Sequence, residues 1–352
     1  MALVCALAAT ASGQPTTTVV MTELDSPRGL AFGPEGALYV AEAGRGGDQP
    51  CVVLRGGQPV PVFAGRTGAV SRLWRGQQER VATGLPSFTE NAPGAPGATG
   101  PHDVTFLGRG NARVSVGLGG EPTFRDSCET IGPGFAQLVK MPASGKWRNW
   151  VDVSAHEEEE NPDGGAVDTN PYGLLARPGA TFVTDAGGNA LLRVAANRTI
   201  STVAVFPSRS TGRVPSTDAV PTTVVRGPDG AYYVGELTGA PFFVGEAKVY
   251  RVVPGEAPTV FLDGFTAIID IAFAADGALW VLQFATGPGL APPGALIRVA
   301  PDGTRTTVAS EELLSPTSVA LGSDGAAYVS NCGVFPGTGP FPCHGHVLRI
   351  VP

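Results

Sequence analysis

The sequence predicts an all-β fold, a six-bladed β-propeller whose blades are four-stranded antiparallel sheets. Three observations predict it: a paired-strand unit that occurs six times, a second hairpin that follows most of these units, and a composition rich in turn-forming residues. The 352 residues include 49 Gly and 32 Pro, yet 43% are hydrophobic and only 16% are charged. Short apolar runs separated by Gly and Pro are typical of many short strands joined by tight turns.

The repeated unit is a short apolar strand, a turn, and a second strand that ends in a polar or acidic residue. Its six copies begin at Ser26, Gly100, Asn170, Val220, Ile268 and Ser315. Four copies contain the turns GPEG, GPDG, AADG and GSDG, in which Gly supplies the positive φ that a tight hairpin requires. We therefore expect six hairpins of the same kind.

A second hairpin follows the first, so each unit forms a four-stranded meander, which is the blade of a propeller. Clear copies run over Ala190–Phe206, Ala247–Phe265 and Ala295–Ser310, and fainter copies over Ala69–Gly84 and Ala136–Val153. The early units are longer because their loops carry insertions, at 44–68 and 117–135.

The last unit is incomplete, because only one strand, His346–Val351, follows its first hairpin. An unassigned strand, Thr16–Leu24, precedes the first unit. The simplest closure pairs this N-terminal strand with the last blade, which removes an exposed sheet edge. We expect a single propeller domain over 16–352 and a monomer.

The N-terminus is typical of a signal peptide. An apolar run, Ala2–Ala9, leads into Ala9-Thr10-Ala11, which resembles a cleavage site, so residues 1–11 are predicted to be removed. No later stretch is apolar enough to span a bilayer, and we expect a secreted, extracellular protein. The net charge of −7 and the lack of a Lys/Arg cluster argue against a nucleic-acid partner.

Four cysteines remain after removal of such a leader, and an exported setting favours disulfides. Cys332 and Cys343 bracket one Gly/Pro-rich loop and are predicted to pair. Cys51 and Cys128 can pair if their loops meet in space. His344 and His346 follow Cys343, so a zinc site is the alternative there, although the irregular spacing favours the disulfide.

Polar residues gather where the chain enters the first strand and leaves the second strand of each blade. These loops share one face, opposite the PDG-type turns, and are expected to converge on the mouth of the central channel. The candidate ligand-binding residues are Arg28, Glu42, His102, Asp103, Asp168, Asn170, Tyr172, Asp185, Asn189, Glu236 and Asp270. Such a ring suits a small molecule or a protein partner. We assign no cofactor, but Ca²⁺ is the ion that these oxygen donors would suit.

His102 is the one candidate for acid–base chemistry, because few other groups at this face titrate near neutral pH. Asp103 is its neighbour in sequence, but adjacent residues of a strand point to opposite sides, so the two side chains need not meet. The sequence contains no G-x-S-x-G elbow, no phosphate-binding P-loop and no dinucleotide fingerprint. Nothing therefore indicates a nucleotide or a serine hydrolase.

One acidic stretch, HEEEENPDGGAVDTNPYG, runs from His156 to Gly173. Ser154 and Glu157 fit a capping box, which predicts a short helix over SAHEEEE with its glutamates exposed to solvent. The following Asn161–Gly165 segment is expected to form a tight turn. The loop should then deliver Asp168, Asn170 and Tyr172 to the channel mouth.

With these units in place, the chain resembles the ScyD/ScyE family of exported propeller-like proteins. The resemblance is carried by SPRGLAFGPEGALYVAEAGRGGD, GATGPHDVTF, NPDGGAVDTNPYGLLA, TDAGGNALLRV, STVAVFPSR, GPDGAYYVGELTG and YRVVPGEAPTV, and it spans Ser26 to about Ile350. It implies a six-bladed fold and export, and it assigns no molecular activity.

More distantly, the chain is similar to NHL-type and gluconolactonase-type propellers. Calcium lactonases of that group present an inward Glu, Asn and Asp set where the first strands begin. The matching positions here are Arg28, His102, Tyr172, Thr222, Ile269 and Thr317, so that ligand set is not reproduced. The leading hypothesis is an exported propeller that binds a small molecule or partner. The alternative is a Ca²⁺-dependent lactonase or hydrolase.

Overall fold

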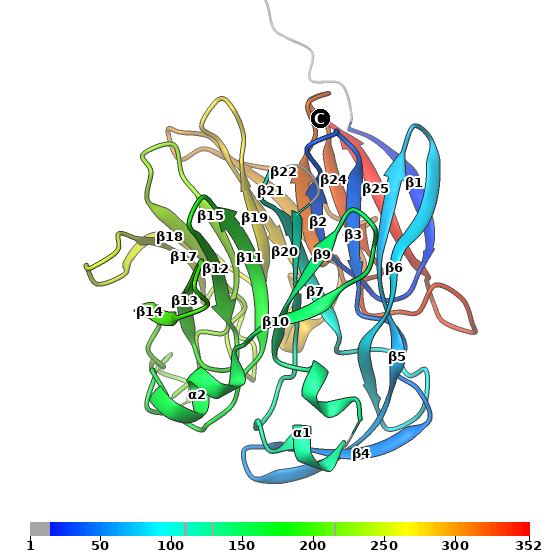
Figure 1. Ribbon diagram of the computed structural model, residues 1–352. Helices are drawn as coiled ribbons and strands as arrows, with labels where there is room; N and C mark the ends of the chain where they lie inside the picture. Colours follow the sequence, from blue (N-terminus) through cyan, green and yellow to red (C-terminus); the bar gives the residue numbers. More distant parts are fainter. Residues whose placement is uncertain (1–14, 109–110, 129, 215) are drawn as a thin grey trace, which may run out of the picture.

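The computed structural model describes residues 15–108, 111–128, 130–214 and 216–352. These residues form six antiparallel sheets, each with a four-stranded meander (Figure 1). The predicted leader, residues 1–11, lies outside the described residues. The six repeat units of the sequence correspond to the six sheets, which confirms the predicted strand pattern and is consistent with a six-bladed propeller.

The first three sheets follow the chain order. The first contains β2 (Pro27–Phe32), β3 (Leu38–Glu42), β5 (Gln58–Trp74) and β6 (Gln77–Glu90), with β4 (Gln49–Arg55) added beside the first part of β5. The second contains β7 (Pro101–Phe106), β8 (Asn111–Val116), β9 (Gln137–Pro142) and β10 (Arg148–Asp152). The third contains β11 (Pro171–Arg177), β12 (Ala180–Asp185), β13 (Ala190–Ala195) and β14 (Ile200–Val205).

The last three sheets repeat the same order until the chain closes. The fourth contains β15 (Pro221–Arg226), β16 (Tyr232–Glu236), β17 (Ala247–Val252) and β18 (Thr259–Phe265). The fifth contains β19 (Ile268–Phe273), β20 (Leu279–Gln283), β21 (Ala295–Val299) and β22 (Arg305–Ala309). The sixth contains β23 (Ser318–Leu321), β24 (Ala327–Asn331), β25 (Gly345–Val351) and β1 (Thr16–Leu24).

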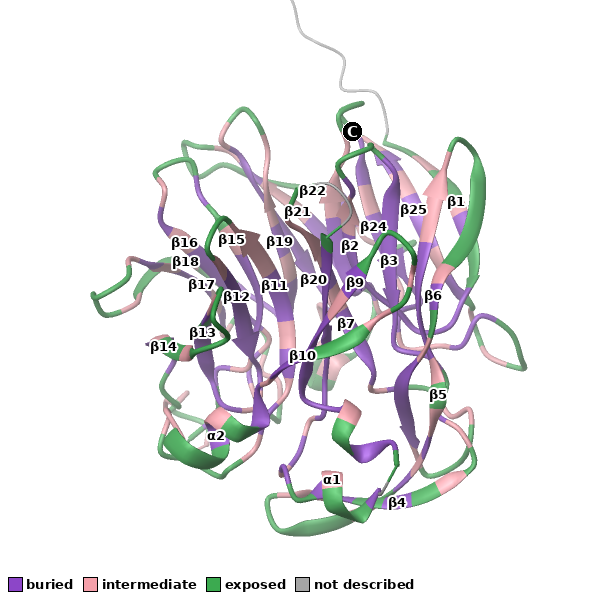
Figure 2. Cartoon of the chain, in the orientation of Figure 1, coloured by how far each residue is buried: buried purple, intermediate pink, exposed green. Residues whose placement is uncertain are grey.

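The innermost strands hold the sheets together. Each first strand contacts the first strand of the next sheet, through β2, β7, β11, β15, β19 and β23, and β23 returns to β2. Among the described residues, the buried apolar side chains form six clusters, and each cluster lies between two neighbouring sheets. Buried residues follow the strands, and exposed residues lie mainly in the turns and outer loops (Figure 2).

The N-terminal strand completes the sixth sheet, as the sequence predicts. β1 pairs antiparallel with β25, with Thr16 opposite Val351 and Leu24 opposite Gly345. The blue and red strands lie side by side in Figure 1. Met21 and Leu24 are buried against residues of the first sheet, such as Leu30 and Val40. The closure therefore joins the two ends of the chain through a shared apolar core.

The described residues contain two disulfides, Cys51–Cys128 and Cys332–Cys343. The predicted Cys332–Cys343 disulfide is confirmed, so these two cysteines are not zinc ligands. The first pair fastens β4 to the segment after the short helix α1 (Phe124–Ser127), in the insertions of the first two units. No helix among the described residues is both long and apolar enough to cross a bilayer.

The helix α2 (Ser154–Glu160) forms where the acidic stretch predicts it, but the capping box does not form. Ser154 lies inside the helix, and its hydroxyl donates instead to Asp152 Oδ1 at 2.6 Å. Asp152 also accepts from the backbone N–H of Ala155 at 3.3 Å, so the acid before the helix takes the capping role. Glu158, Glu159 and Glu160 are exposed as expected, but Glu157 is only 3% exposed.

Replacing Leu24 by Ala should lower the free energy of unfolding by about 2–5 kcal/mol, because it leaves a cavity in the cluster that closes the ring. Chemical denaturation followed by tryptophan fluorescence measures the change. Val19→Thr is the matched control on the same strand, because Val19 is 54% exposed, and it should shift the value by less than about 0.5 kcal/mol. Equal losses in the two variants would contradict the closing role of β1.

Candidate functional site

The innermost strands surround a small central cavity. Four of the predicted residues line it: His102, Asp103, Tyr172 and Asp270. Its volume is about 20 Å³, which is room for about one water molecule. The centre of the molecule is therefore filled by side chains.

His102 is held in a structural contact at this centre. The residue is 4% exposed, and its ring lies in tilted contact with Tyr172, with 4.5 Å between the ring centroids and 37° between the ring planes. Its Nδ1 lies 3.2 Å from the carbonyl oxygen of Pro171, which can only accept, so Nδ1 carries the proton and donates. Burial and the nearby Arg28 guanidinium lower the pKa of His102 to about 3. The imidazole is thus neutral near pH 7 and is not poised as an acid–base group.

The carboxylates of Asp103 and Asp270 link neighbouring innermost strands. Asp103 Oδ2 accepts from the backbone N–H of Leu174 in the next sheet at 2.7 Å. Asp270 accepts from the hydroxyls of Thr223 at 2.7 Å and Ser318 at 2.6 Å, which belong to the sheets on either side. Burial raises the pKa of both carboxyls, and for Asp103 the charge of Asp270 adds to the effect. Their oxygen atoms are therefore occupied by bonds within the scaffold.

Two of the predicted residues, Glu42 and Asp185, fix loops, and Gln283 and Asn331 do the same in other sheets. The residue that ends the second strand of a sheet accepts a backbone N–H from the loop that leads into the first strand. These bonds are Asp25 N to Glu42 (2.7 Å), Asn170 N to Asp185 (2.6 Å), Thr266 N to Gln283 (2.7 Å) and Leu314 N to Asn331 (2.9 Å). The polar residue that ends the second strand is thus a loop anchor in four of the six repeats, as expected of buried polar groups.

Two buried glutamates that end second strands, Glu42 and Glu236, pair with arginine. Glu42 pairs with Arg80, with 2.7 Å between Oε2 and Nη2. Glu236 pairs with Arg209, whose Nη1 donates to Oε2 at 3.0 Å. Burial raises the pKa of Glu236 to about 7, against the opposing effect of Arg209. Neither pair lies in the central cavity.

A third group lies at the loop end of the third sheet. Asp168 and Asn189 line a pocket of about 330 Å³ together with Asp163 and Asp218. Asn189 Nδ2 donates to Asp163 Oδ2 at 2.8 Å. Burial raises the pKa of Asp168 to about 6, and the charges of Asp185, Asp163 and Asp218 add to the effect. This part of the loop-rich face is hollow and acidic.

Glu157 lies behind the same pocket. Burial is the main cause that raises its pKa to about 8, and the neighbouring charges of Asp185, Asp163 and Asp168 contribute. Within the described part of the chain, no Lys or Arg side chain donates to the Glu157 carboxyl group. Its Oε1 atom has no hydrogen-bond partner there at all. The prediction that Glu157 is exposed to solvent is wrong, because α2 turns its side chain toward Gly188.

The structure therefore divides the eleven predicted residues instead of gathering them at one mouth. Arg28, His102, Asp103, Tyr172 and Asp270 lie at the centre; Asp168, Asn170, Asp185 and Asn189 lie at the loops of the third sheet; and Glu42 and Glu236 sit in separate ion pairs. Whether any of them contacts a ligand stays a prediction. The Gly187-Gly188 pair is the one pattern in the sequence that relates to the burial of Glu157. In the structure neither glycine has a positive φ, so the pair permits a close approach of side chains instead of forming a turn.

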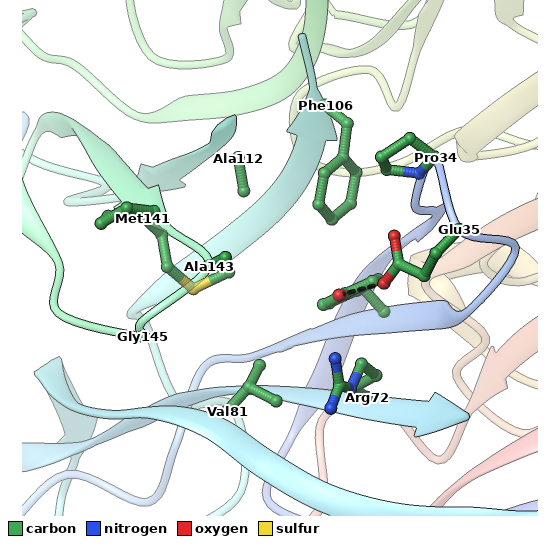
Figure 3. A pocket seen from close by; sticks show the side chains of 11 residues that line it. Pro34, Glu35, Arg72, Val81, Phe106, Ala112, Met141, Ala143 and Gly145 are labelled. Atoms are coloured by element: carbon green, nitrogen blue, oxygen red, sulfur yellow. Dashed lines mark hydrogen bonds between the residues drawn. The ribbon is translucent and has the colours of Figure 1, made fainter. Parts of the chain in front are cut away.

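A larger cleft lies between the first and second sheets, at the face that carries the turns. Its volume is about 410 Å³, and its walls include Phe106, Met141 and Val81, with Glu35 and Arg72 at one side (Figure 3). The Tyr39 hydroxyl donates to Glu35 Oε1 at 2.5 Å, which is the dashed line in Figure 3. The Tyr39 and Phe106 rings are in tilted contact, with 4.6 Å between centroids and 56° between their planes. No single stretch of sequence indicates this cleft, because its lining comes from two different units.

The polar groups at the centre do not fit a calcium ion. Ca²⁺ takes six to eight oxygen ligands, whereas the oxygens of Asp103 and Asp270 accept backbone and hydroxyl hydrogen bonds. In the described part of the chain, no group of three or more His, Cys, Asp or Glu side chains is arranged to hold a metal ion.

Comparison with known proteins shows the fold and nothing finer. No protein-family model matches the chain, and no curated protein does. A putative oxidoreductase (glucose dehydrogenase) from Thermus thermophilus aligns with a TM-score of 0.55 at 16% identity, over 96% of this chain and 100% of that one. Regucalcin from Agrobacterium tumefaciens, a calcium-binding protein, aligns with 0.53 at 14%, over 94% and 93%. A streptogramin B lyase aligns with 0.51 at 12%, over 96% and 97%.

These neighbours include an oxidoreductase, a calcium-binding protein and a lyase, so the shared fold does not indicate one activity. They agree with the distant likeness to gluconolactonase-type propellers that the sequence indicates. Function has to be inferred from this chain's own cavities and charges.

Glu157 should make stability depend on pH. Its pKa is about 8 in the folded state and near 4.5 when unfolded, so folding takes up a proton between these values. Its contribution is complete below about pH 4.5 and is lost as the pH rises through 8. We expect Glu157→Gln to flatten the fall of the melting temperature between pH 5 and 8 and to raise it at pH 8.

Differential scanning fluorimetry at half-unit pH steps measures this effect. Glu159→Gln is the matched control, because Glu159 is an exposed residue of the same helix and its substitution removes the same charge. Parallel curves for wild type and Glu157→Gln would show that Glu157 titrates as an ordinary surface residue.

Proposed function

We propose that this protein is an exported, single-domain and monomeric β-propeller of the ScyD/ScyE type, closed by its N-terminal strand, that binds a small molecule without transforming it. The two disulfides are consistent with an extracellular setting. The observation that carries the binding function is the cleft between the first and second sheets. Its volume of about 410 Å³ lies within the range typical of small-molecule sites.

The lining of the cleft indicates the kind of molecule that it takes. Phe106, Met141 and Val81 offer apolar contact to a flat body. Arg72 offers a guanidinium, which also donates from Nε to Glu79 at 3.2 Å, and the Glu35–Tyr39 pair offers a further polar contact. A few placed polar groups in an apolar wall set orientation. We infer a small aromatic or alicyclic molecule with one acidic or hydrogen-bonding group.

Catalysis is not part of the proposal. The candidate base His102 has a pKa of about 3 and faces a cavity of about 20 Å³. The alternative, a Ca²⁺-dependent lactonase or hydrolase, rests on likeness of fold alone, and the central carboxylates are already bonded to the scaffold. The loop-rich face retains a separate acidic pocket.

The fluorescent aromatic sulfonate 8-anilinonaphthalene-1-sulfonate tests the cleft. Folded wild-type protein should bind it saturably at one site, with a rise in fluorescence. Ala143→Trp should weaken binding at least about tenfold, because Ala143 is an exposed residue of the cleft rim and an indole would fill the space.

The matched control is Ala196→Trp, at an exposed position of the corresponding turn between β13 and β14, where no such cleft exists among the pockets found. It should bind as wild type does. Saturable binding that Ala143→Trp leaves unchanged, or no saturable binding at all, would rule out the cleft as the site.

A further inference from the structure

The pocket at the loop end of the third sheet is acidic and contains no basic residue in its lining. Its charged side chains are Asp163, Asp168 and Asp218, and the rest of the lining is made of small, amide and apolar residues. The pocket has a volume of about 330 Å³ and lies apart from the cleft between the first two sheets. Three carboxylates therefore face one hollow, and no Lys, Arg or His side chain in that lining balances them.

Two carboxylates here are buried without a full set of partners. Glu157 is 3% exposed, and its Oε1 has no hydrogen-bond partner among the described residues. Asp168 Oδ1 is also buried and unpartnered there. Burying a carboxylate oxygen without a donor is unfavourable, because the oxygen loses its water contacts and gains no replacement. Such an arrangement is stabilised when a cation, or a proton, is supplied from outside the scaffold.

The unpartnered carboxylates converge on the same short backbone segment. A Cβ atom at Gly187 would lie 2.4 Å from Asp168 Oδ1, and one at Gly188 would lie 2.6 Å from Glu157 Oε2. A side chain at either position would displace these oxygens. Asp168 and Glu157 thus pack against two adjacent glycines, of which Gly187 forms part of the pocket lining.

The remaining carboxylate, Asp185, is already satisfied. Its Oδ1 accepts from the backbone N–H groups of Asn170, Gly187 and Gly188 at 2.6, 3.1 and 3.1 Å. Its Oδ2 accepts from Thr169 Oγ1 at 2.5 Å. Asp185 therefore shapes the loop and adds negative potential, while Glu157 Oε1 and Asp168 Oδ1 have no hydrogen-bond donor among the described residues.

The spacing of these groups favours an extended cation over a compact one. A calcium ion would need six to eight oxygens at 2.3–2.6 Å, and no three acidic, His or Cys side chains in the described ranges are placed to share a metal ion. Asp163 is also partly occupied, since it accepts from Gly165 N and Asn189 Nδ2. An ammonium group carries three donors, and a chain with two such groups can reach carboxylates that are spread around a pocket.

We propose that this pocket binds a small organic diamine or polyamine, with one ammonium group on Asp168 and a second toward Asp163 and Asp218. The site is separate from the cleft and does not depend on the function proposed for it. Glu157 acts as a positioning residue, because it lies behind Gly188 and the positive charge of a bound diamine would favour its ionised form. The ligand enters from the loop-rich face.

Isothermal titration calorimetry with butane-1,4-diamine at pH 7.5 and low ionic strength tests the proposal. Wild-type protein should bind one diamine saturably, and the uncharged analogue butane-1,4-diol should not bind. Asp168→Asn should weaken binding at least tenfold. Asp218→Asn, at an exposed position where the amide can still accept from Ser208, should weaken it less and provides a variant that keeps the fold.

Glu159→Gln is the control for a general loss of negative charge and should bind as wild type does. Lowering the pH to 5 should weaken binding, because protons compete for Asp168, which faces Asp163, Asp185, Asp218, Glu121 and Glu157 and no basic group in the pocket lining. Equal affinity in wild type and in both aspartate variants, or no saturable diamine binding, would overturn the proposal. Saturable Ca²⁺ binding that excludes the diamine would also overturn it, in favour of a metal site.

Discussion

The centre of this molecule depends on the hydrogen bonds that the side chain of Asp270 accepts. It accepts hydrogen bonds from Thr223 on one neighbouring sheet and from Ser318 and Val319 on the other, so three innermost strands meet on one side chain. Asp103, in the second sheet, accepts a hydrogen bond from the backbone N–H of Leu174 in the third sheet and so joins these two sheets. A Cβ atom at Gly29 would lie 2.1 Å from Asp103 Oδ1, so the first sheet also closes tightly on that carboxyl.

A centre closed in this way has consequences for where ligands can bind. Thr222 and Thr317 add hydroxyl bonds to the carbonyls of Ile268 and Pro27 in the next sheets, and little free space remains on the axis. The larger hollows lie toward the outside, between the turns of two sheets and among the loops of the third. Binding at such places leaves the ring undisturbed, because strands fix the positions of the lining residues while the loops and turns vary.

Much of the fold could be predicted from the sequence, because its signals are local. Each GPDG-type turn and its flanking apolar strands are read within one short window, and the unpaired strand Thr16–Leu24 has one natural partner. The Cys332–Cys343 pair follows from the shortness of its loop. These features need no knowledge of how distant units meet.

The site residues were harder to interpret, because their roles depend on contacts between units. Asp270 and Val319 lie in different repeats, and nothing near either residue shows that they are bonded. Glu157 fits a capping pattern by its spacing from Ser154, yet Asp152 takes that role and the glutamate turns inward. The cleft walls come from turns of two units, so no single stretch of sequence contains its signal.

The pairing of β1 with β25 also sets the order in which the chain can fold. β1 is synthesised early, but its partner Val351 lies near the other end of the sequence. Until β25 arrives, β1 has no strand to pair with, and its apolar residues Met21 and Leu24 have no sixth sheet to cover them. Contacts this distant in sequence are slow to form. We therefore expect the pairing of β1 with β25 to form last. Until it forms, the chain has an open sheet edge that chaperones or proteases can recognise.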